Sequence, residues 1–288
     1  MPKKKLIAVI NELSGNAKAA EEQKFLLSLA QDYDVARIYY IKGKNDGFDL
    51  AGCQAVAVYG GDGTLNSVLR KLPKDDEIEI LYRPSGTLNE LGKTIKQRCG
   101  KDLTLSETGV FCGMRFAYVA AAGTFTSIGV MTSTKEKKRV KFFAYFSDVL
   151  RFYKVMHIKA DINSDAGDFS GEYTLMMFID SNRCFGFRFN SLYKPNDGKL
   201  HMLLIRAPKG SGLFAKIKIF FPMFRVFFMG LRREIRTKNI VFANISSAQL
   251  KLYEPQRFCF DGECQNVGGT FSVGVEPLKS PIRLITYD

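Results

Sequence analysis

The chain has 288 residues, enough for one large domain or for two domains of ordinary size, and we expect two. Hydrophobic residues make up 46% and charged residues 25%, which is typical of a folded globular protein and disfavours a disordered or membrane-embedded chain. Lysine and arginine exceed aspartate and glutamate by 42 to 29, a net charge of +13. This excess indicates a polyanionic partner such as phosphate, an acidic membrane surface or nucleic acid.

Histidine and cysteine limit the chemistry further. The two histidines, His157 and His201, offer little material for a histidine triad, so the expected general base is a carboxylate. The cysteines form no CxxC pair, so we expect buried, reduced thiols and neither a zinc site nor a disulfide framework. They are Cys53, Cys99, Cys112, Cys184, Cys259 and Cys264. The N-terminus runs into an apolar strand without a secretory signal, which predicts a protein that stays inside the cell.

The first 110 residues alternate strand and helix patterns, so we predict a parallel, doubly wound α/β domain. Short apolar runs followed by turn residues predict the strands, and apolar residues at spacings of three and four predict the helices. The predicted strands cover residues 5–10, 35–41, 53–59 and 78–82, and the predicted helices cover residues 17–31, 64–72 and 88–95.

Beyond residue 110 the pattern changes to strand runs separated by turn residues, which predicts a β-rich, antiparallel, sandwich-like domain over residues 111–275. The C-terminal tail, residues 276–288, is a candidate return to the first domain. Predicted strands cover residues 113–122, 172–180, 199–206, 248–253 and 269–275, with helical insertions at 141–153 and 213–230.

A glycine-rich segment, Gly60-Gly61-Asp62-Gly63-Thr64-Leu65-Asn66, follows a buried strand and opens a helix. Glycines let the backbone approach a ligand closely, and the first amides of a helix favour an anion. A plain tight turn is the alternative, but open α/β sheets bind ligands at the carboxyl ends of their strands. We therefore predict a phosphate-binding loop. It is not a dinucleotide fingerprint, because Asn66 stands at the third glycine, and Gly92-Lys93-Thr94 is out of register for a Walker A motif.

The segment GGDGTLN is similar to the signature shared by diacylglycerol kinases, sphingosine kinases and bacterial soluble lipid kinases, with more distant echoes in NAD kinases and phosphofructokinases. Further segments extend the resemblance over nearly the whole chain. Asn11-Glu12-Leu13-Ser14-Gly15 resembles the family's NPxSG loop, and Gly86-Thr87-Leu88-Asn89-Glu90-Leu91 resembles its GTxNDF segment. Phe260-Asp261-Gly262-Glu263 resembles its DGE, and Asp197-Gly198-Lys199-Leu200 its DGxL. Glu12, Glu90 and Arg83-Pro84-Ser85 depart from the family pattern.

The resemblance implies a kinase that holds ATP on the first domain, in a cleft shared with the second. The implied ATP-binding residues are Asn11, Ser14, Gly15, Gly60, Gly61, Asp62, Gly63, Thr64, Asn66, Gly86, Thr87 and Asn89. Phosphoryl transfer asks mainly for positioning and charge neutralisation, which glycine-rich amides and Mg²⁺ supply. Arg83 is either a cation beside the phosphate loops or a solvated residue at a strand end.

The family analogy assigns proton acceptance from the acceptor hydroxyl to Glu263, aided by Asp261. Without the resemblance, Asp-Gly is a strong hairpin-turn signal. By the same analogy, Asp197 and the backbone carbonyls of Lys194 and Lys199 form a structural magnesium site, where the bare sequence predicts only a β-turn.

The segment 213–230 mixes bulky apolar residues with Lys216, Lys218 and Arg225, and Arg232 and Arg233 follow it. This composition suits either a core helix or a helix that docks on an anionic bilayer. We expect a cytoplasmic protein that associates peripherally with membranes.

The leading hypothesis is an ATP- and magnesium-dependent lipid kinase that phosphorylates the hydroxyl of diacylglycerol or a similar lipid. The alternatives are an NAD kinase and a non-catalytic relative that binds membranes or anions. No nucleic-acid-binding motif accompanies the basic charge, so a nucleic-acid partner is not expected. The sequence identifies neither the acceptor lipid nor the oligomeric state, and a homodimer is left open.

Overall fold

The computed structural model describes residues 2–16, 18–43, 46–73, 77–124 and 154–286. The predicted helix at 141–153 lies outside these residues. The chain forms two compact units, one made of residues 1–108 with 276–288 and the other of residues 109–275. Each unit is described by itself.

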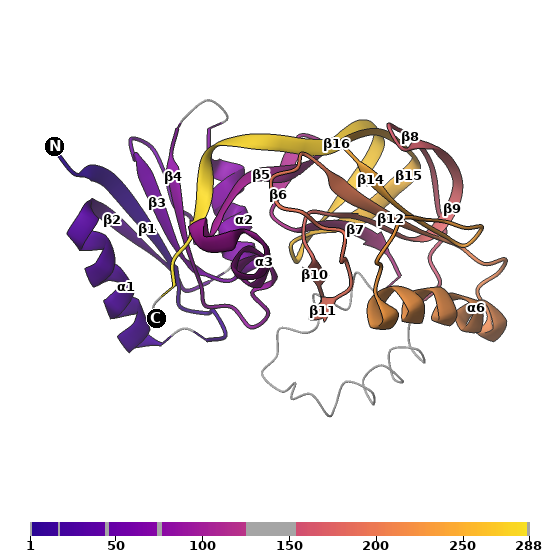
Figure 1. The fold of residues 1–288 in the computed structure, drawn as a ribbon, viewed down its shortest axis with the longest axis horizontal. Helices are drawn as coiled ribbons and strands as arrows, with labels where there is room; N and C mark the ends of the chain where they lie inside the picture. The colour runs from indigo at the N-terminus through magenta and orange to yellow at the C-terminus, as the bar shows by residue number, and fades with distance from the viewer. Residues whose placement is uncertain (1, 17, 44–45, 74–76, 125–153, 287–288) are drawn as a thin grey trace. The chain divides into compact units, whose positions relative to one another are not determined.

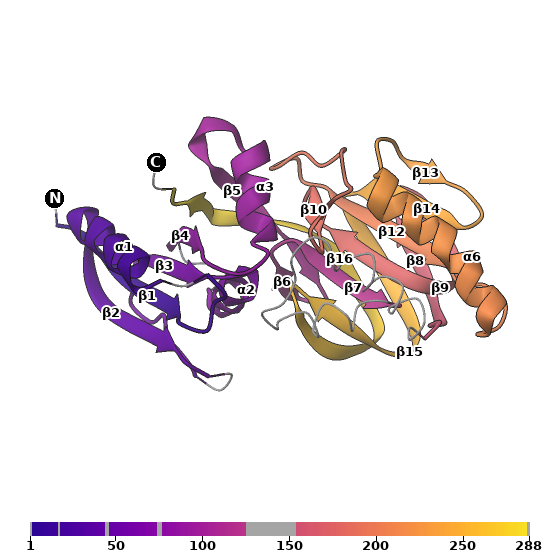
Figure 2. The same ribbon diagram turned by 90° about the horizontal axis from the view of Figure 1, so that it is seen from below.

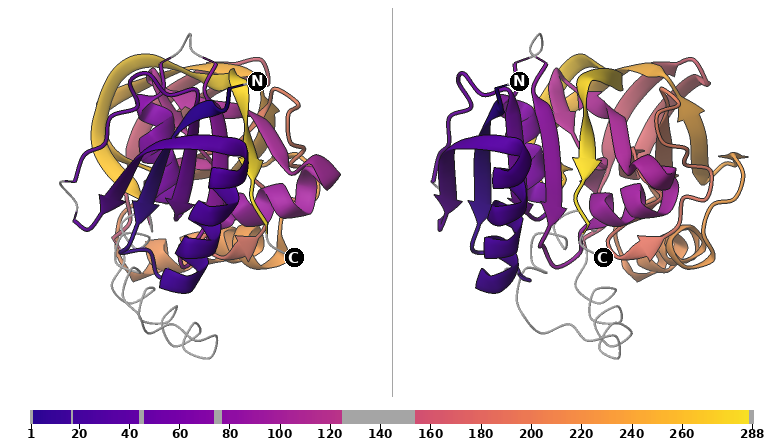
Figure 3. Two further views of the ribbon diagram at one scale, coloured as in Figure 1. Left: turned by 90° about the vertical axis from the view of Figure 1, so that its left-hand side faces the viewer. Right: turned by 60° about the vertical axis from the view of Figure 1, so that its left-hand side comes forward.

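The first unit is built on a parallel sheet with strand order β2–β1–β3–β4–β16 (Figure 1). Every residue of β3 is buried, as expected for a strand covered on both faces. The yellow end of β16 runs beside β4 in both views of Figure 3, so the C-terminus completes the sheet of the N-terminal unit. The strands are β1 (Lys4–Asn11), β2 (Tyr33–Ile41), β3 (Ala55–Gly60), β4 (Glu79–Pro84) and the last residues of β16 (Glu263–Leu284).

Helices cover both faces of this sheet. On one face, Phe25 and Leu29 of α1 pack against alternate residues of β1 and β3. Leu81 of β4 belongs to the same cluster, so its neighbour Tyr82 points to the opposite face, where its hydroxyl contacts Asp62 of α2. The helices are α1 (Ala19–Asp32), α2 (Asp62–Lys71), α3 (Glu90–Arg98) and the short 3₁₀ helix η1 (Gly100–Asp102).

The second unit is an antiparallel β structure around one apolar core. Its strands follow the order β13–β14–β12–β9–β7–β15–β16, while β8 pairs with both β9 and β15, and β5 pairs with β6. The bounds are β5 (Thr104–Phe111), β6 (Met114–Phe116), β7 (Val119–Gly123), β8 (Ile158–Ser164), β9 (Gly167–Ile179), β12 (Leu200–Arg206), β13 (Ile235–Arg236), β14 (Ile240–Ile245) and β15 (Ser247–Phe260).

The core of the second unit is rich in phenylalanine. Phe111 contacts Phe178, Phe258, Phe260 and Phe271, with ring centroids 4.4–5.5 Å apart. A small separate pair, β10 (Arg183–Cys184) and β11 (Phe187–Arg188), lies between β9 and β12 in sequence. The α-helix α6 (Leu213–Phe224) continues as the π-helix η2 (Arg225–Met229) and lies on the outer side of this unit (Figures 1 and 2).

The predicted fold class is confirmed: an α/β unit with a doubly wound parallel sheet and a β-rich antiparallel unit. Apart from the one that falls outside the described residues, each predicted helix has a counterpart. Within the described residues, no helix is long and apolar enough to cross a membrane.

The expectation for the cysteines is wrong in part. Cys53 and Cys184 are buried and outside any disulfide bond, as expected, but Cys112 is exposed and Cys259 is joined to Cys264 by a disulfide bond. The reason is local: a two-residue turn at Asp261-Gly262 places Cys259 directly opposite Cys264 on the β15–β16 hairpin. A search for CxxC spacing misses such a pair, although the Asp-Gly turn signal implies the pairing.

Candidate active site

Three loops meet at the carboxyl edge of the parallel sheet. They follow β1 (residues 11–16), β3 (residues 60–64) and β4 (residues 84–89). The Ser85 amide donates to the Gly60 carbonyl at 2.8 Å, and the Asn16 amide donates to the Ser85 carbonyl at the same distance. The side-chain Nδ2 of Asn16 donates to the Gly86 carbonyl at 2.7 Å. These bonds hold the three predicted ATP-binding loops together.

Glycine is required where the loops touch. A Cβ on Gly86 would lie 2.7 Å from the Cα of Gly61, and a Cβ on Gly15 would overlap the hydroxyl of Thr87. A Cβ on Gly60 would lie 2.6 Å from the side chain of Thr64. Any larger residue would push the loops apart, so these glycines bring the backbones together and do not merely allow a turn.

Asn11 and Thr64 tie the first loop to the start of α2. The Nδ2 of Asn11 donates to the Thr64 hydroxyl at 2.8 Å, and its Oδ1 accepts the Leu13 amide at 3.0 Å. Gly61 is the N-cap of α2 and gives it no side-chain cap. The first amides of a helix have no intrahelical acceptor, so this edge offers N–H donors and a positive partial charge.

Three side-chain oxygens at the loops are unusual. Among the described residues, the hydroxyls of Ser14 and Ser85 and the Oδ1 of Asn89 are buried without a hydrogen-bond partner. These three oxygens belong to the loops that meet at this edge, so a ligand bound there would complete their hydrogen bonding. Asn89 also has a left-handed φ of 49°, which a non-glycine residue adopts rarely.

The side chain of Asp62 reaches the start of α3. Its carboxylate accepts the amides of Glu90 and Leu91, at 2.7 and 3.2 Å, and the hydroxyl of Tyr82 at 3.1 Å. It therefore caps α3, a task that the side chain of Asn89 does not perform. Burial raises the pKa of Asp62 to about 6, although its three donors act in the opposite direction.

Arg83 was expected to be either a cation beside the phosphate loops or a solvated residue at a strand end, and it fits neither description fully. Its guanidinium lies 3.6 Å from the carboxylate of Glu21 on α1 and 3.4 Å from the carbonyl of Ile285. The side chain is only 20% exposed. These contacts tie the end of β4 to α1 and to the C-terminal segment.

In the second unit, Asp261 and Glu263 lie on the turn between β15 and β16. Asp261 and Gly262 have φ of 51° and 103°, and Phe260 pairs with Glu263, as in a two-residue hairpin. The Asp261 carboxylate is buried and accepts the amides of Ala117, Tyr118 and Val119 at 2.5–3.0 Å. Glu263 is exposed. Asp261 thus anchors the segment before β7, and the expected proton-accepting role of Glu263 stays a prediction.

The predicted magnesium loop is an exposed turn. Asn196 and Gly198 have positive φ, and Oδ1 of Asp197 accepts the Lys199 amide at 3.1 Å, closing an Asx turn. The metal-binding roles of Asp197, Lys194 and Lys199 stay predictions. Within the described ranges, no group of three or more His, Cys, Asp or Glu side chains is arranged to hold a metal ion.

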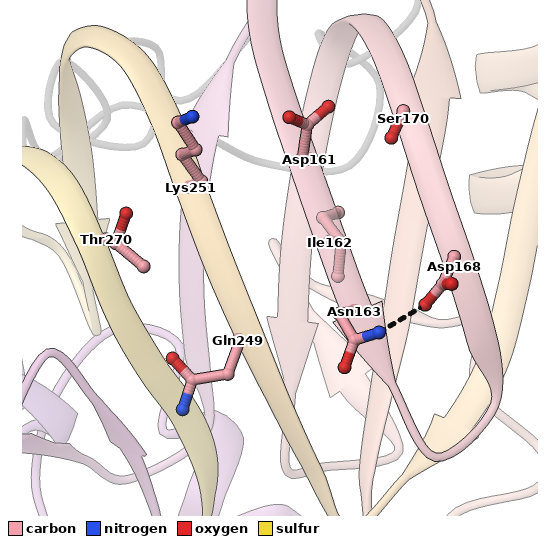
Figure 4. A pocket seen from close by; sticks show the side chains of 8 residues that line it. All are labelled: Asp161, Ile162, Asn163, Asp168, Ser170, Gln249, Lys251 and Thr270. Carbon is pink, nitrogen blue, oxygen red and sulfur yellow. Dashed lines mark hydrogen bonds between the residues drawn. The ribbon is translucent and has the colours of Figure 1, made fainter.

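A shallow depression of about 330 Å³ lies elsewhere on the second unit (Figure 4). It is lined by polar side chains of β8, β9, β15 and β16, among them Asp161, Asp168 and Lys251. Asn163 donates to Asp168 at 2.6 Å, and Asp161 accepts the Tyr253 hydroxyl. None of the predicted site residues lines it. The carboxylates of Asp161 and Asp168 are thus hydrogen-bonded to neighbouring side chains. The loop edge of the first unit is therefore the better candidate site.

Sequence reasoning missed four residues that hold this edge: Asn16, Tyr82, Ser85 and Glu90. Asn16 and Ser85 adjoin the recognised motifs, so their position next to the glycines was an available signal. Tyr82 and Glu90 act through contacts with Asp62, which lies 20 and 28 positions away in the chain. No local pattern reveals such contacts.

The first unit has a parallel sheet whose glycine loops gather at its carboxyl edge, where open α/β sheets bind ligands, and the chain continues into an antiparallel β unit. Residues 5–107 match the family model of the diacylglycerol kinase catalytic domain, which confirms the predicted resemblance in that segment.

Individual relatives agree with this family. The chain is 24% identical over 249 residues to a diacylglycerol kinase of Staphylococcus carnosus, covering 81% of this chain and 76% of that protein. It is 23% identical over 242 residues to a putative lipid kinase of Streptococcus pneumoniae, covering 75% and 78%. A solved structure described as a putative diacylglycerol kinase from Bacillus anthracis superposes with a TM-score of 0.71 over 97% of this chain and 96% of that one. At 16% identity this last likeness shows the fold alone.

Proposed function

We propose that this protein is a lipid kinase that transfers the γ-phosphoryl group of ATP, with Mg²⁺, to the hydroxyl of a diacylglycerol-like lipid in the cytoplasm. The match to the diacylglycerol kinase catalytic domain and the two named relatives support the reaction class. The single observation that carries the proposal is the convergence of three loops at one sheet edge, with glycine backbones in contact and unpaired buried oxygens beside the start of α2.

The donor chemistry of this edge suits a nucleoside triphosphate. Amides of Gly61, Asp62 and Gly63 at the start of α2 would hold phosphate oxygens, and the hydroxyls of Ser14 and Ser85 would donate to phosphate or ribose. The side chain of Asp62 is excluded from this set because it caps α3. Asp62 would act by holding the Gly86–Asn89 loop in place.

Mg²⁺ suits this arrangement as a companion of the nucleotide. It binds through one or two carboxylates and substrate phosphates more often than in an all-protein cage. When bound, it would neutralise charge on the phosphates during transfer. Such a site needs no all-protein cage.

Glu263 is our candidate for the proton acceptor of the lipid hydroxyl. It is exposed at the end of a rigid hairpin turn, while its neighbour Asp261 is fully engaged by three amides. Asp261 could accept a proton only by giving up its three bonds, so the solvent-exposed carboxylate of Glu263 is the better candidate.

Labelled ATP, Mg²⁺ and mixed micelles test the proposal, with diacylglycerol, ceramide, sphingosine or phosphatidylglycerol offered in turn. We expect a labelled product from diacylglycerol or a close analogue. Absence of any labelled lipid would overturn the proposal. Formation of NADP from NAD would instead favour an NAD kinase.

Substitution of Glu263 tests its role as the proton acceptor. Glu263→Gln should lower kcat by at least ~100-fold and leave ATP binding intact, because it removes only the proton acceptor. Glu254→Gln, at an exposed position of β15, is the matched control and should be active. An active Glu263→Gln would refute this role for Glu263 while leaving the kinase assignment standing.

A further inference from the structure

The helix α6 carries two apolar faces. One is buried against the second unit and contains Ala215, Ile219, Met223 and, in η2, Val226. The other is exposed and contains Leu213, Phe214, Ile217, Phe221 and Phe224. At about 100° per residue these two sets lie on nearly opposite sides of the helix. The sequence left open whether this segment is a core helix or a helix with an exposed apolar face. One face of α6 fits the first description, and the opposite face fits the second.

The exposure on the outer face is large for apolar side chains. Phe214 is 82% exposed and Phe221 is 67% exposed, and Met229 extends the same apolar surface beyond the helix. Scattered apolar residues on a protein surface are ordinary, but bulky ones gathered along one helix face mark an interaction site. Figure 2 shows the helix at the outside of its unit.

The charged residues of the segment that carries this face have a single sign. Residues 207–233 contain six lysines and arginines and no aspartate or glutamate. Helical spacing places Lys216 along one border of the exposed apolar face, and Lys218 and Arg225 along the other. Lys218 and Arg225 are themselves exposed. The apolar stripe is therefore bordered by cations on both sides.

A basic depression adjoins the end of η2. It has a volume of about 530 Å³ and is lined by Arg225, Arg232 and Arg233 together with Met229, Gly230 and Ile235. Arginine binds phosphate oxygens through two parallel N–H groups. The depression thus places anion-binding groups next to exposed apolar residues.

We propose that the outer face of α6 and η2 is a docking surface for an anionic phospholipid bilayer. The apolar side chains would enter the boundary between headgroups and acyl chains, and the bordering cations and the arginine-lined depression would meet lipid phosphates. A helix lying in the interface with aromatic and aliphatic residues on one side and cations at its edges has this composition.

Charge complementarity favours this occupant over a second copy of the chain. Two copies related by a twofold axis would oppose like charges along the borders of the stripe, because residues 207–233 carry no acidic partner for them. The inference deepens the proposed function, since an acceptor such as diacylglycerol resides in a membrane. The test of the docking surface measures vesicle binding and not kinase activity. A failure of this proposal can therefore be told apart from a failure of the kinase proposal.

Absence of tryptophan from the chain allows a direct probe of this face. In Phe214→Trp, the single tryptophan should shift its emission to shorter wavelength on addition of vesicles of equimolar phosphatidylglycerol and phosphatidylcholine. Leu27→Trp, at an exposed position of α1 in the other unit, is the matched control and should show no shift. Equal shifts for both variants, or none for either, would overturn the proposal.

Vesicle sedimentation of variants separates the apolar and basic contributions. Phe214→Gln with Phe221→Gln should weaken binding to the same vesicles by at least ~10-fold, because two large apolar side chains no longer enter the interface. Arg232→Gln with Arg233→Gln should weaken it by at least ~5-fold. Lys24→Gln, exposed on α1, should bind like the parent protein.

Lipid composition and association state complete the test. Binding should weaken on pure phosphatidylcholine vesicles and at high salt, since screening removes the attraction between exposed charges. The proposal is overturned if the parent protein ignores anionic vesicles, or if the Phe214 and Phe221 substitutions instead abolish a dimer seen by analytical ultracentrifugation. It is also overturned if the arginine substitutions leave vesicle binding unchanged.

Discussion

The carboxylate of Asp62, within the glycine-rich motif, accepts the backbone amide of Glu90 at the start of α3, 2.7 Å away. A residue that the motif suggests for phosphate or magnesium chemistry thus works as the cap of a second helix. The contact links the loop after β3 to the loop after β4, the two segments whose glycine backbones lie closest together.

Replacing Asp62 should destabilise the first unit. Asp62→Ala removes an acceptor from two buried amides and a tyrosine hydroxyl, which costs about 1–3 kcal/mol of unfolding free energy. Urea unfolding followed by circular dichroism measures the loss. Asp49→Ala is the matched control, because Asp49 is exposed and accepts the Ala51 amide at the surface. Equal stability of the two variants would contradict the capping role.

Gly86→Ala should weaken nucleotide binding. The added Cβ would meet the Cα of Gly61 at 2.7 Å, so the two loops must separate and the anion-binding amides must move. We expect ATP affinity to fall about 10-fold or more, because small misplacements of positioning groups are costly. Calorimetric titration with ATP measures this fall. Gly47→Ala, where nothing lies within 4 Å of the added atom, should bind ATP normally.

His201 should make the second unit less stable in acid. Burial lowers the pKa of His201 to about 4, and neighbouring Lys199 acts in the same direction. Below the ordinary histidine pKa of about 6.5, the unfolded chain therefore binds a proton that the folded chain refuses, so stability falls as the pH drops.

The expected size of this acid effect is about 2–3 kcal/mol between pH 7 and roughly pH 4.5. The measurement is the unfolding free energy at each of the two pH values. The loss of stability between them should be smaller in His201→Gln than in the parent protein by this amount. Asp62, whose pKa is raised, acts in the opposite direction, so the comparison with the parent protein is essential.

The disulfide bond predicts a thiol count. Alkylation of the denatured protein without reductant should label four of the six cysteines, because Cys259 and Cys264 are joined. Reduction before alkylation should raise the count to six. The short loop suggests that Cys259→Ala with Cys264→Ala costs at most about 2 kcal/mol, since β15 and β16 stay paired without the bond. Six labelled thiols without reductant would refute the disulfide.

Sequence periodicity determined the alternation of strands and helices, because each element of the first unit carries its own local pattern. The glycine motif could be placed between β3 and α2 for the same reason: strand burial, glycine and helix spacing are all local signals. The hairpin turn at Asp261-Gly262 was readable from two residues. The exposed and buried faces of α6 were mixed in one segment, so composition alone could not assign them.

Only the tertiary structure decided which groups these residues bind. Asp62 lies among glycines in sequence, yet its carboxylate serves amides of residues 90 and 91; Asp261 lies beside Glu263, yet it binds amides of residues 117–119. Hydrogen bonds between residues far apart in the chain depend on how strands and helices pack. That packing leaves no periodic trace in the sequence, so a motif names the residues at the site without saying which of them faces the ligand.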